Sequence, residues 1–189
     1  MDRRKFVARL LADRNGLLVV TGIGSSTYDV AACGDDPLNF YLWSAMGSTA
    51  MVGLGLAMAR PDRRVAVITG DGDMLMGLGS LATIGVKQPK NLTVFVLDNG
   101  HYSASGMQPS ATKSGVDLAA AARACNLRVE AVSTMDRVDE LRALLHAGSG
   151  PHFIHARVDA DDQKRIIPSR DGLAIKHRFM QAVGAPRTA

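Results

Sequence analysis

The sequence lacks the features that mark several large classes of protein. Its 189 residues include two cysteines, Cys33 and Cys125, and these do not form a C-x-x-C pair. That spacing argues against a zinc site or a disulfide framework, so we expect two buried, reduced thiols. Aromatic residues make up 5% of the chain, and no long basic run accompanies the net charge of +4. A nucleic-acid-binding protein is therefore not indicated.

Long apolar runs are also missing. No run of 18 apolar residues occurs, and four of the first five residues are charged. Neither a membrane-spanning helix nor a secretory signal is indicated, so we expect a cytoplasmic protein that does not bind membranes. Hydrophobic residues nevertheless make up 47% of the chain, enough for a substantial core. We expect a single domain over residues 1–189.

Short apolar runs alternate with longer segments of helical length. The runs have the composition of strands buried on both faces, and they span residues 17–20, 64–69, 92–97, 127–132 and 152–158. The helical segments span residues 4–14, 48–59, 73–85, 116–125, 136–146 and 171–183. This alternation predicts an α/β fold, a three-layer sandwich with a mainly parallel central sheet.

Polar loops follow three of the predicted strands, at 22–26, 70–73 and 98–102. Because the carboxyl ends of parallel strands lie at one edge of a sheet, we expect these loops to converge. The two glycines of the first loop suggest a nicotinamide or flavin fingerprint. That fingerprint, G-x-G-x-x-G, would need glycine where Thr27 stands, so the match fails.

The second and third loops carry the residues with the clearest chemistry. Asp71 offers a carboxylate and Asn99 a carboxamide, and oxygen ligands of this kind suit a hard divalent cation. Gly70 and Gly72 leave backbone N–H groups open just before a predicted helix, which suits a phosphate. Each glycine-rich triplet alone is commonly a simple turn. Together, at the ends of one strand-helix-strand unit, they favour a magnesium-bridged diphosphate cofactor.

These motifs resemble those of the thiamine-diphosphate-dependent enzymes. Gly70-Asp71-Gly72, followed after 26 residues by Asn99, is similar to the cofactor motif of their diphosphate-binding domain. Segments along nearly the whole chain are similar to the sulfopyruvate decarboxylase beta chains and to half of phosphonopyruvate decarboxylase. They span residues 39–47, 53–57, 97–100, 106–109, 151–155 and 178–180. The resemblance implies the thiamine-diphosphate-binding fold, with thiamine diphosphate and Mg²⁺ as cofactors.

The resemblance also implies metal and cofactor ligands. Asp71, Asn99 and the backbone carbonyl of His101 would bind Mg²⁺. The backbone of Gly72 and Asp73 would meet the diphosphate, with the Asp73 side chain turned outward. The whole implied cofactor-binding set is Gly24, Ser25, Ser44, Met46, Gly47, Gly70, Asp71, Gly72, Asp73, Asn99, His101 and Tyr102.

Two members of this set have more specific implied roles. Met46 matches the large apolar residue that bends the cofactor, and the Ser44 carbonyl matches the acceptor for its 4'-amino group. Met51 and Met58 are expected in the core. The imidazole of His101 is a weaker catalytic candidate. Candidates to line the substrate end of the pocket are Tyr102, Ser103, Ser105 and Gln108, although their place in a loop explains their polarity equally well.

The resemblance implies that the site needs a second chain. In this family, the glutamate that activates the cofactor belongs to a pyrimidine-binding domain, which 189 residues do not accommodate. The implied protein is the beta subunit of a split 2-oxo acid decarboxylase, and it shares its active site with a separate alpha subunit. Met46 and the helix at 48–59 would face that partner.

The substrate and the fate of the reaction stay open at this point. Thr27-Tyr28-Asp29 stands where relatives carry Ser-Arg-Glu, so an arginine suited to sulfonate or phosphonate is absent there. A carboligase or lyase subunit with the same cofactor is one alternative. A noncatalytic cofactor-binding or regulatory subunit is another. A ferredoxin-linked oxidoreductase is disfavoured, because the chain has no cysteine cluster.

Overall fold

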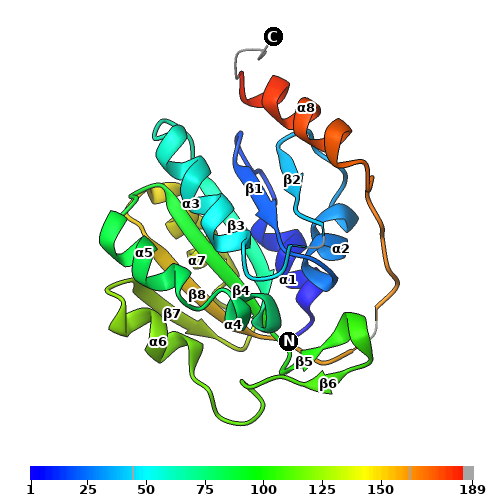
Figure 1. Ribbon diagram of the computed structural model, residues 1–189, viewed down its shortest axis with the longest axis vertical. Coiled ribbons are helices and arrows are strands. Elements are labelled where there is room, and N and C mark those ends of the chain that lie inside the picture. Colours follow the sequence, from blue (N-terminus) through cyan, green and yellow to red (C-terminus); the bar gives the residue numbers. More distant parts are fainter. Residues whose placement is uncertain (44, 162, 185–189) are drawn as a thin grey trace.

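The computed structural model describes residues 1–43, 45–161 and 163–184. Within these residues, a sheet of six parallel strands has the order β2-β1-β3-β4-β8-β7 (Figure 1). Its strands are β1 (Leu18–Thr21), β2 (Asn39–Tyr41), β3 (Val65–Gly70), β4 (Leu92–Asp98), β7 (Arg128–Val132) and β8 (His152–Arg157). The parallel sheet confirms the predicted α/β class. Sequence analysis missed β2, since its three residues are too few to form a distinct apolar run.

Helices cover both faces of this sheet and make the three layers (Figure 1). One face carries α1 (Arg3–Leu10), α2 (Ser25–Ala32) and α7 (Val138–Ala147). The other carries α3 (Thr49–Ala59), α5 (Ser80–Lys87) and α6 (Leu118–Ala124), while α8 (Gly172–Val183) contacts the edge strand β2. Within the described residues, no helix combines the length and apolar character that crossing a membrane requires.

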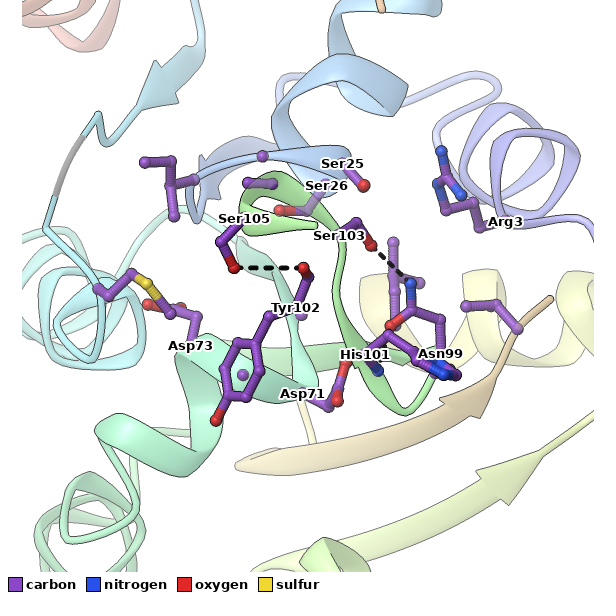
Figure 2. Close-up of a pocket in the computed structure, with 18 residues that line it drawn as sticks. Arg3, Ser25, Ser26, Asp71, Asp73, Asn99, His101, Tyr102, Ser103 and Ser105 are labelled. Atoms are coloured by element: carbon purple, nitrogen blue, oxygen red, sulfur yellow. Dashed lines mark hydrogen bonds between the residues drawn. The ribbon is translucent and has the colours of Figure 1, made fainter. Parts of the chain in front are cut away.

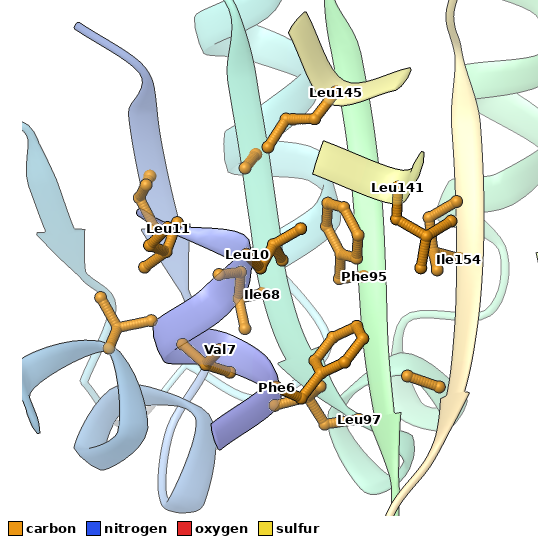
Figure 3. Packing of buried hydrophobic residues seen from close by; sticks show 14 of the residues in the cluster. Phe6, Val7, Leu10, Leu11, Ile68, Phe95, Leu97, Leu141, Leu145 and Ile154 are labelled. Carbon is orange, nitrogen blue, oxygen red and sulfur yellow. The ribbon is translucent and has the colours of Figure 1, made fainter. Parts of the chain in front are cut away.

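Alternate side chains of the central strands supply the two cores. Ile68 and Phe95 belong to the cluster under α1 and α7, and Val67 and Val94 belong to the cluster under α3 and α5. In the first cluster, Phe6 of α1 packs edge-on against Phe95, with ring centroids 6.5 Å apart (Figure 3). This contact fixes α1 across the middle of the sheet.

The path of the chain places a crevice between β1 and β3. From β1 the chain moves outward to β2, and from β3 it moves the other way to β4. The helix that follows β1 packs on one face, and the helices that follow β3 pack on the opposite face. Such a reversal of strand order is where open α/β sheets bind ligands, beyond the carboxyl ends of the strands.

The helix α2 begins at Ser25, within a stretch predicted to be a loop. Its first residues are hydroxyl-bearing and lack apolar spacing, which is why the pattern did not reveal a helix. Thr27 Oγ1 donates a 2.6 Å hydrogen bond to the Gly22 carbonyl, and Ser26 Oγ donates a 3.2 Å bond to the same oxygen. These two hydrogen bonds attach the first turn of α2 to the residue that follows β1.

The helix predicted over residues 73–85 is two helices, α4 (Asp71–Met76) and α5. The chain between them passes very close to the backbone of another loop. A Cβ at Gly77 would lie 2.2 Å from the carbonyl oxygen of Gly47. Only glycine allows this approach. The sequence pattern did not reveal that the helix is interrupted at Gly77.

Two predictions of burial are wrong. Cys33 is exposed, contrary to the prediction, whereas Cys125 is partly buried and packs against the cluster under α3 and α5. Met51 and Met58 have 40% and 53% of their surface exposed. The cause is that α3 turns a different side toward the sheet, which leaves these two methionines on its outer side; the buried residues are Thr49, Ala50, Gly53, Leu54 and Ala57.

We predict opposite effects for two glycines of α3. A Cβ at Gly53 would lie 2.1 Å from Cγ2 of Val67, whereas a Cβ at Gly55 would meet no atom within 4 Å. Gly53→Ala should therefore lower the free energy of unfolding by about 1–3 kcal/mol through overpacking. Gly55→Ala should raise it by up to about 1 kcal/mol through helix propensity. Urea denaturation followed by circular dichroism measures both, and equal effects would contradict the close packing of α3.

Candidate functional site

A cavity opens at the carboxyl edge of the sheet, in the crevice between β1 and β3 (Figure 2). It is lined by Arg3, Ile23, Gly24, Ser25, Ser26, Met46, Gly70, Asp71, Gly72, Asp73, Leu97, Asn99, His101, Tyr102, Ser103, Ala104, Ser105 and Val158. The structure thus brings together most of the cofactor-binding residues implied by the resemblance. Of that set, Gly47 lies outside the lining, and Ser44 falls outside the described residues.

Asp71, the first residue of α4, is almost fully buried, with 2% of its surface exposed. Its Oδ2 accepts hydrogen bonds from the hydroxyl of Ser110 and, at 3.3 Å, from that of Thr112. Burial raises the pKa of this carboxyl above its usual range. The hydrogen bond from Ser110 opposes that rise, while the nearby charge of Asp98 adds to it.

Asn99 and His101 form a tight turn after β4. The Asn99 Oδ1 accepts a 2.9 Å hydrogen bond from the His101 backbone N–H, and its Nδ2 donates at 2.8 Å to Ser103 Oγ (Figure 2). The His101 ring Nδ1 lies 2.7 Å from the carbonyl oxygen of Asn99. That ring nitrogen is therefore engaged with the backbone of its own turn.

The Asp73 side chain does not turn outward, as the sequence had led us to expect. It is buried, with 5% of its surface exposed. Its Oδ1 accepts a 2.6 Å hydrogen bond from the Gly47 backbone N–H, and its Oδ2 accepts one from the Thr69 hydroxyl. Both acceptor oxygens are thereby occupied, so Asp73 ties the loop that carries Met46 to the end of β3.

A small hairpin covers one side of the cavity, where the sequence predicted a loop without regular structure. Its strands are β5 (His101–Tyr102) and β6 (Gln108–Pro109), joined through the 3₁₀ turn η1 (Ser103–Ser105). The Tyr102 ring lies so close to Gly72 that a Cβ there would be 2.5 Å from Cε1. Ser103 and Ser105 line the cavity as predicted, but Gln108 instead bonds to Ser105.

Sequence reasoning missed a second buried carboxylate, Asp98, at the end of β4. Its Oδ2 lies 2.6 Å from His155 Nε2, and its Oδ1 accepts from Thr112 Oγ1 at 2.8 Å and from the Gly100 N–H at 2.9 Å. Burial opposes ionisation, but the hydrogen bonds from His155 and Thr112 outweigh it and lower the pKa of Asp98. Its position in the Asp98-Asn99-Gly100 triplet was the one available signal.

Arg3 was also missed, because it lies far from every motif. It projects from the start of α1 to the cavity edge, where it is 4% exposed. Its Nε donates a 2.8 Å hydrogen bond to Asp29 Oδ2, and Arg4 Nε donates at 3.0 Å to the other oxygen. Asp29 is thus the buried partner of two arginines.

The residues present fit a magnesium-bound diphosphate. The hydrogen bonds among the described residues engage only Oδ2 of Asp71. The side-chain Oδ1 of Asn99 accepts one hydrogen bond and has a second lone pair. A Cβ at Gly70 would meet no atom within 4 Å, so the wall there is open. Among the described residues, no three His, Cys, Asp or Glu side chains gather as a metal site. A cation here would depend on amide, carbonyl and phosphate oxygens as well, as Mg²⁺ commonly does.

The sequence over residues 22–156 matches the family described as thiamine pyrophosphate enzyme, C-terminal TPP binding domain. The chain belongs to this family. Thiamine pyrophosphate is another name for thiamine diphosphate, so the family relationship agrees with the resemblance read from the motifs. Its matched region contains every residue of the implied cofactor-binding set.

Curated relatives match over most of this chain. Sulfopyruvate decarboxylase subunit beta of Methanothermobacter thermautotrophicus is 31% identical, over 97% of this chain and 96% of the relative. Phosphonopyruvate decarboxylase of Streptomyces viridochromogenes is 42% identical, over 94% of this chain but 45% of the relative. The chain therefore spans less than half the length of the phosphonopyruvate enzyme and almost the whole length of the beta subunit.

Solved structures support the fold. A thiamin diphosphate-dependent enzyme from Mycobacterium smegmatis superposes with a TM-score of 0.71 at 21% identity, over 85% of this chain and 32% of that chain. A 4-hydroxybenzoylformate decarboxylase from Rhodococcus jostii gives a TM-score of 0.67 at 23% identity, over 86% and 33% respectively. At these identities the likeness establishes the fold alone.

We predict that Asp73 matters for stability through its two hydrogen bonds. Asp73→Ala leaves the buried Thr69 hydroxyl and the Gly47 N–H without their acceptor, which should cost about 1–3 kcal/mol per group left unpaired. Urea denaturation measures the loss. Asp62→Ala is the control, because Asp62 forms an exposed ion pair with Arg60 and its removal should leave the midpoint almost unchanged. Equal midpoints for wild type and Asp73→Ala would contradict the assignment.

Proposed function

We propose that this chain is the beta subunit of a split 2-oxo acid decarboxylase that depends on thiamine diphosphate and Mg²⁺. The observation that carries the proposal is the placement of Asp71 and Asn99 in one cavity at the crevice between β1 and β3. Sequence similarity from end to end with a sulfopyruvate decarboxylase beta subunit supports it. In this proposal, residues 1–189 act as a single diphosphate-binding domain.

The residues of the cavity divide into those that would hold the metal and those that would hold the cofactor. Asp71, Asn99 and the His101 carbonyl would bind Mg²⁺, and the backbone of Gly72 with the polar groups of Ser25 would face the diphosphate. When bound, thiamine diphosphate supplies an electron sink that accepts the electron pair released as carbon dioxide leaves a 2-oxo acid. The chain's own part is to orient the cofactor and to shield the site with the 101–109 hairpin.

Two features support a separate alpha subunit. The cavity has a volume of about 150 Å³, which is below the roughly 300–1,000 Å³ of typical cofactor pockets, so this chain encloses only part of a site. Met46, which lines the cavity, has 38% of its surface exposed, and Met76, which lies next to Gly47, has 63% exposed. Exposed apolar side chains at a partial pocket are typical of a surface that a partner covers.

The substrate in this proposal is a small 2-oxo acid. The relatives that match over 78% or more of this chain, at 31–42% identity, are named as decarboxylases of sulfopyruvate and phosphonopyruvate, which favours decarboxylation over the carboligase and lyase alternatives. The buried Asp29 is paired with Arg3 and Arg4, so these two arginines are already engaged by a carboxylate of the chain itself. In this proposal, a sulfonate or phosphonate group of the substrate is bound by residues of the partner.

The test is an assay of the chain purified together with the product of a neighbouring alpha-subunit gene. We expect carbon dioxide release from a 2-oxo acid that requires both Mg²⁺ and thiamine diphosphate. Binding of thiamine diphosphate without turnover on a broad panel of 2-oxo acids would support the noncatalytic alternative instead. Formation of a new carbon–carbon bond between two substrates would support a carboligase.

We predict that Asp71→Ala weakens Mg²⁺-dependent thiamine diphosphate binding by at least about 100-fold, since loss of a supporting residue alone typically costs 10- to 100-fold. Isothermal titration calorimetry on the complex measures the affinity. Asp62→Ala, with its exposed carboxylate at the opposite end of β3, should bind like the wild type. Unchanged affinity in Asp71→Ala would reject the metal assignment.

A further inference from the structure

Two buried carboxylates are linked through hydroxyl groups: Asp71, which lines the cavity, and Asp98, which is not part of the lining. Asp71 begins α4 and Asp98 ends β4, with 2% and 1% of their surfaces exposed. Hydroxyl groups of Ser110 and Thr112 lie between them, with the two hydroxyl oxygens 2.9 Å apart. Ser110 Oγ donates to Asp71 Oδ2, and Thr112 Oγ1 lies 3.3 Å from the same oxygen and 2.8 Å from Asp98 Oδ1.

Asp98, at one end of the Ser110 and Thr112 hydroxyl pair, is held in a fixed position. Asp98 Oδ2 is held by His155 Nε2 of β8 at 2.6 Å, and Asp98 Oδ1 also accepts from the Gly100 N–H. Asp98 therefore cannot rotate without breaking contacts to three separate parts of the chain. Thr112 donates its single hydroxyl proton to this fixed acceptor at 2.8 Å, which gives its side chain a defined position, and its Oγ1 then bounds the place of the Ser110 hydroxyl 2.9 Å away.

The hydrogen bonds to Asp71 reach only one of its two carboxylate oxygens. Both hydroxyls address Oδ2, whereas the hydrogen bonds among the described residues leave Oδ1 to the cavity that Asp71 lines. A carboxylate can rotate about its χ2 torsion, and that torsion is broad and poorly defined by intrinsic preference. Anchoring one oxygen therefore selects the direction in which the other points.

We propose that Ser110 and Thr112 are positioning residues that orient the Asp71 carboxylate toward a divalent cation, with Asp98 as their anchor. This inference rests on the proposed function, because the cation is the one expected to bridge Asp71 to the cofactor diphosphate. Neither residue belongs to the 70–73 or 98–102 motif, and both come from the segment after β6. Groups that orient metal ligands in this way tune affinity without touching the metal.

The test measures metal affinity directly, using Mn²⁺ in place of Mg²⁺ and electron paramagnetic resonance of the complex with thiamine diphosphate and the alpha subunit. Ser110→Ala removes the direct donor, and Thr112→Val removes the bridging hydroxyl while keeping the shape of the side chain. We expect each to weaken Mn²⁺ binding by 10- to 100-fold. Thr112→Ser keeps the hydroxyl and should restore affinity to within about threefold of wild type.

Ser114→Ala is the matched control, since Ser114 lies exposed in the same segment and should bind Mn²⁺ like the wild type. Thermal unfolding without metal identifies any variant that is simply misfolded, and the Thr112→Val and Thr112→Ser pair separates loss of the hydroxyl from loss of packing. Wild-type affinity in both Ser110→Ala and Thr112→Val would overturn the inference and leave the proposed function standing. Absence of Mn²⁺ binding by the wild-type complex would overturn both.

Discussion

The site depends on the burial of charged carboxylates at the edge of a parallel sheet. An ionised carboxylate is costly to bury unless hydrogen bonds or opposite charges compensate it. Asp98 receives that compensation within the chain, from Thr112, Gly100 and His155. Asp71 receives less compensation, because its hydrogen bonds reach only one of its two oxygens. Burial accordingly raises its pKa. The fold therefore presents a partly uncompensated carboxylate to the cavity, and a divalent cation is the partner that would compensate it.

A second set of contacts fixes the wall opposite Asp71. Asp73 binds the Gly47 N–H, and the Gly47 carbonyl in turn packs against Gly77 so closely that a side chain would not fit. A Cβ at Gly22 would lie 2.9 Å from Asp73 Oδ2, so the end of β1 meets the same carboxylate. One buried side chain thus joins the end of β3 to the loop that carries Met46 and packs beside the end of β1. The distance across the crevice is set by this packing.

The sequence predicted the sheet and the cavity better than it predicted the supporting contacts. Strand-end loops converge in any parallel sheet, so the grouping of Gly24, Asp71 and Asn99 followed from topology and periodicity alone. The inward turn of Asp73 did not, because its partner Gly47 is 26 residues away and carries no side chain to mark the contact. The bond from Ser110 to Asp71 spans 39 residues and leaves no local pattern.

Exposure of apolar side chains on α3 follows from the same close packing. The helix approaches β3 so closely that Gly53 meets Val67, and Ala50, Leu54 and Ala57 complete its buried side. Met51 and Met58 lie on the other side of the helix, where they are exposed. An isolated domain would gain by placing polar residues at those positions. Met51 stands in the first turn of α3, just after the loop that carries Met46 at the cavity, and its apolar character is accounted for if a second chain covers this end of α3 and completes the pocket.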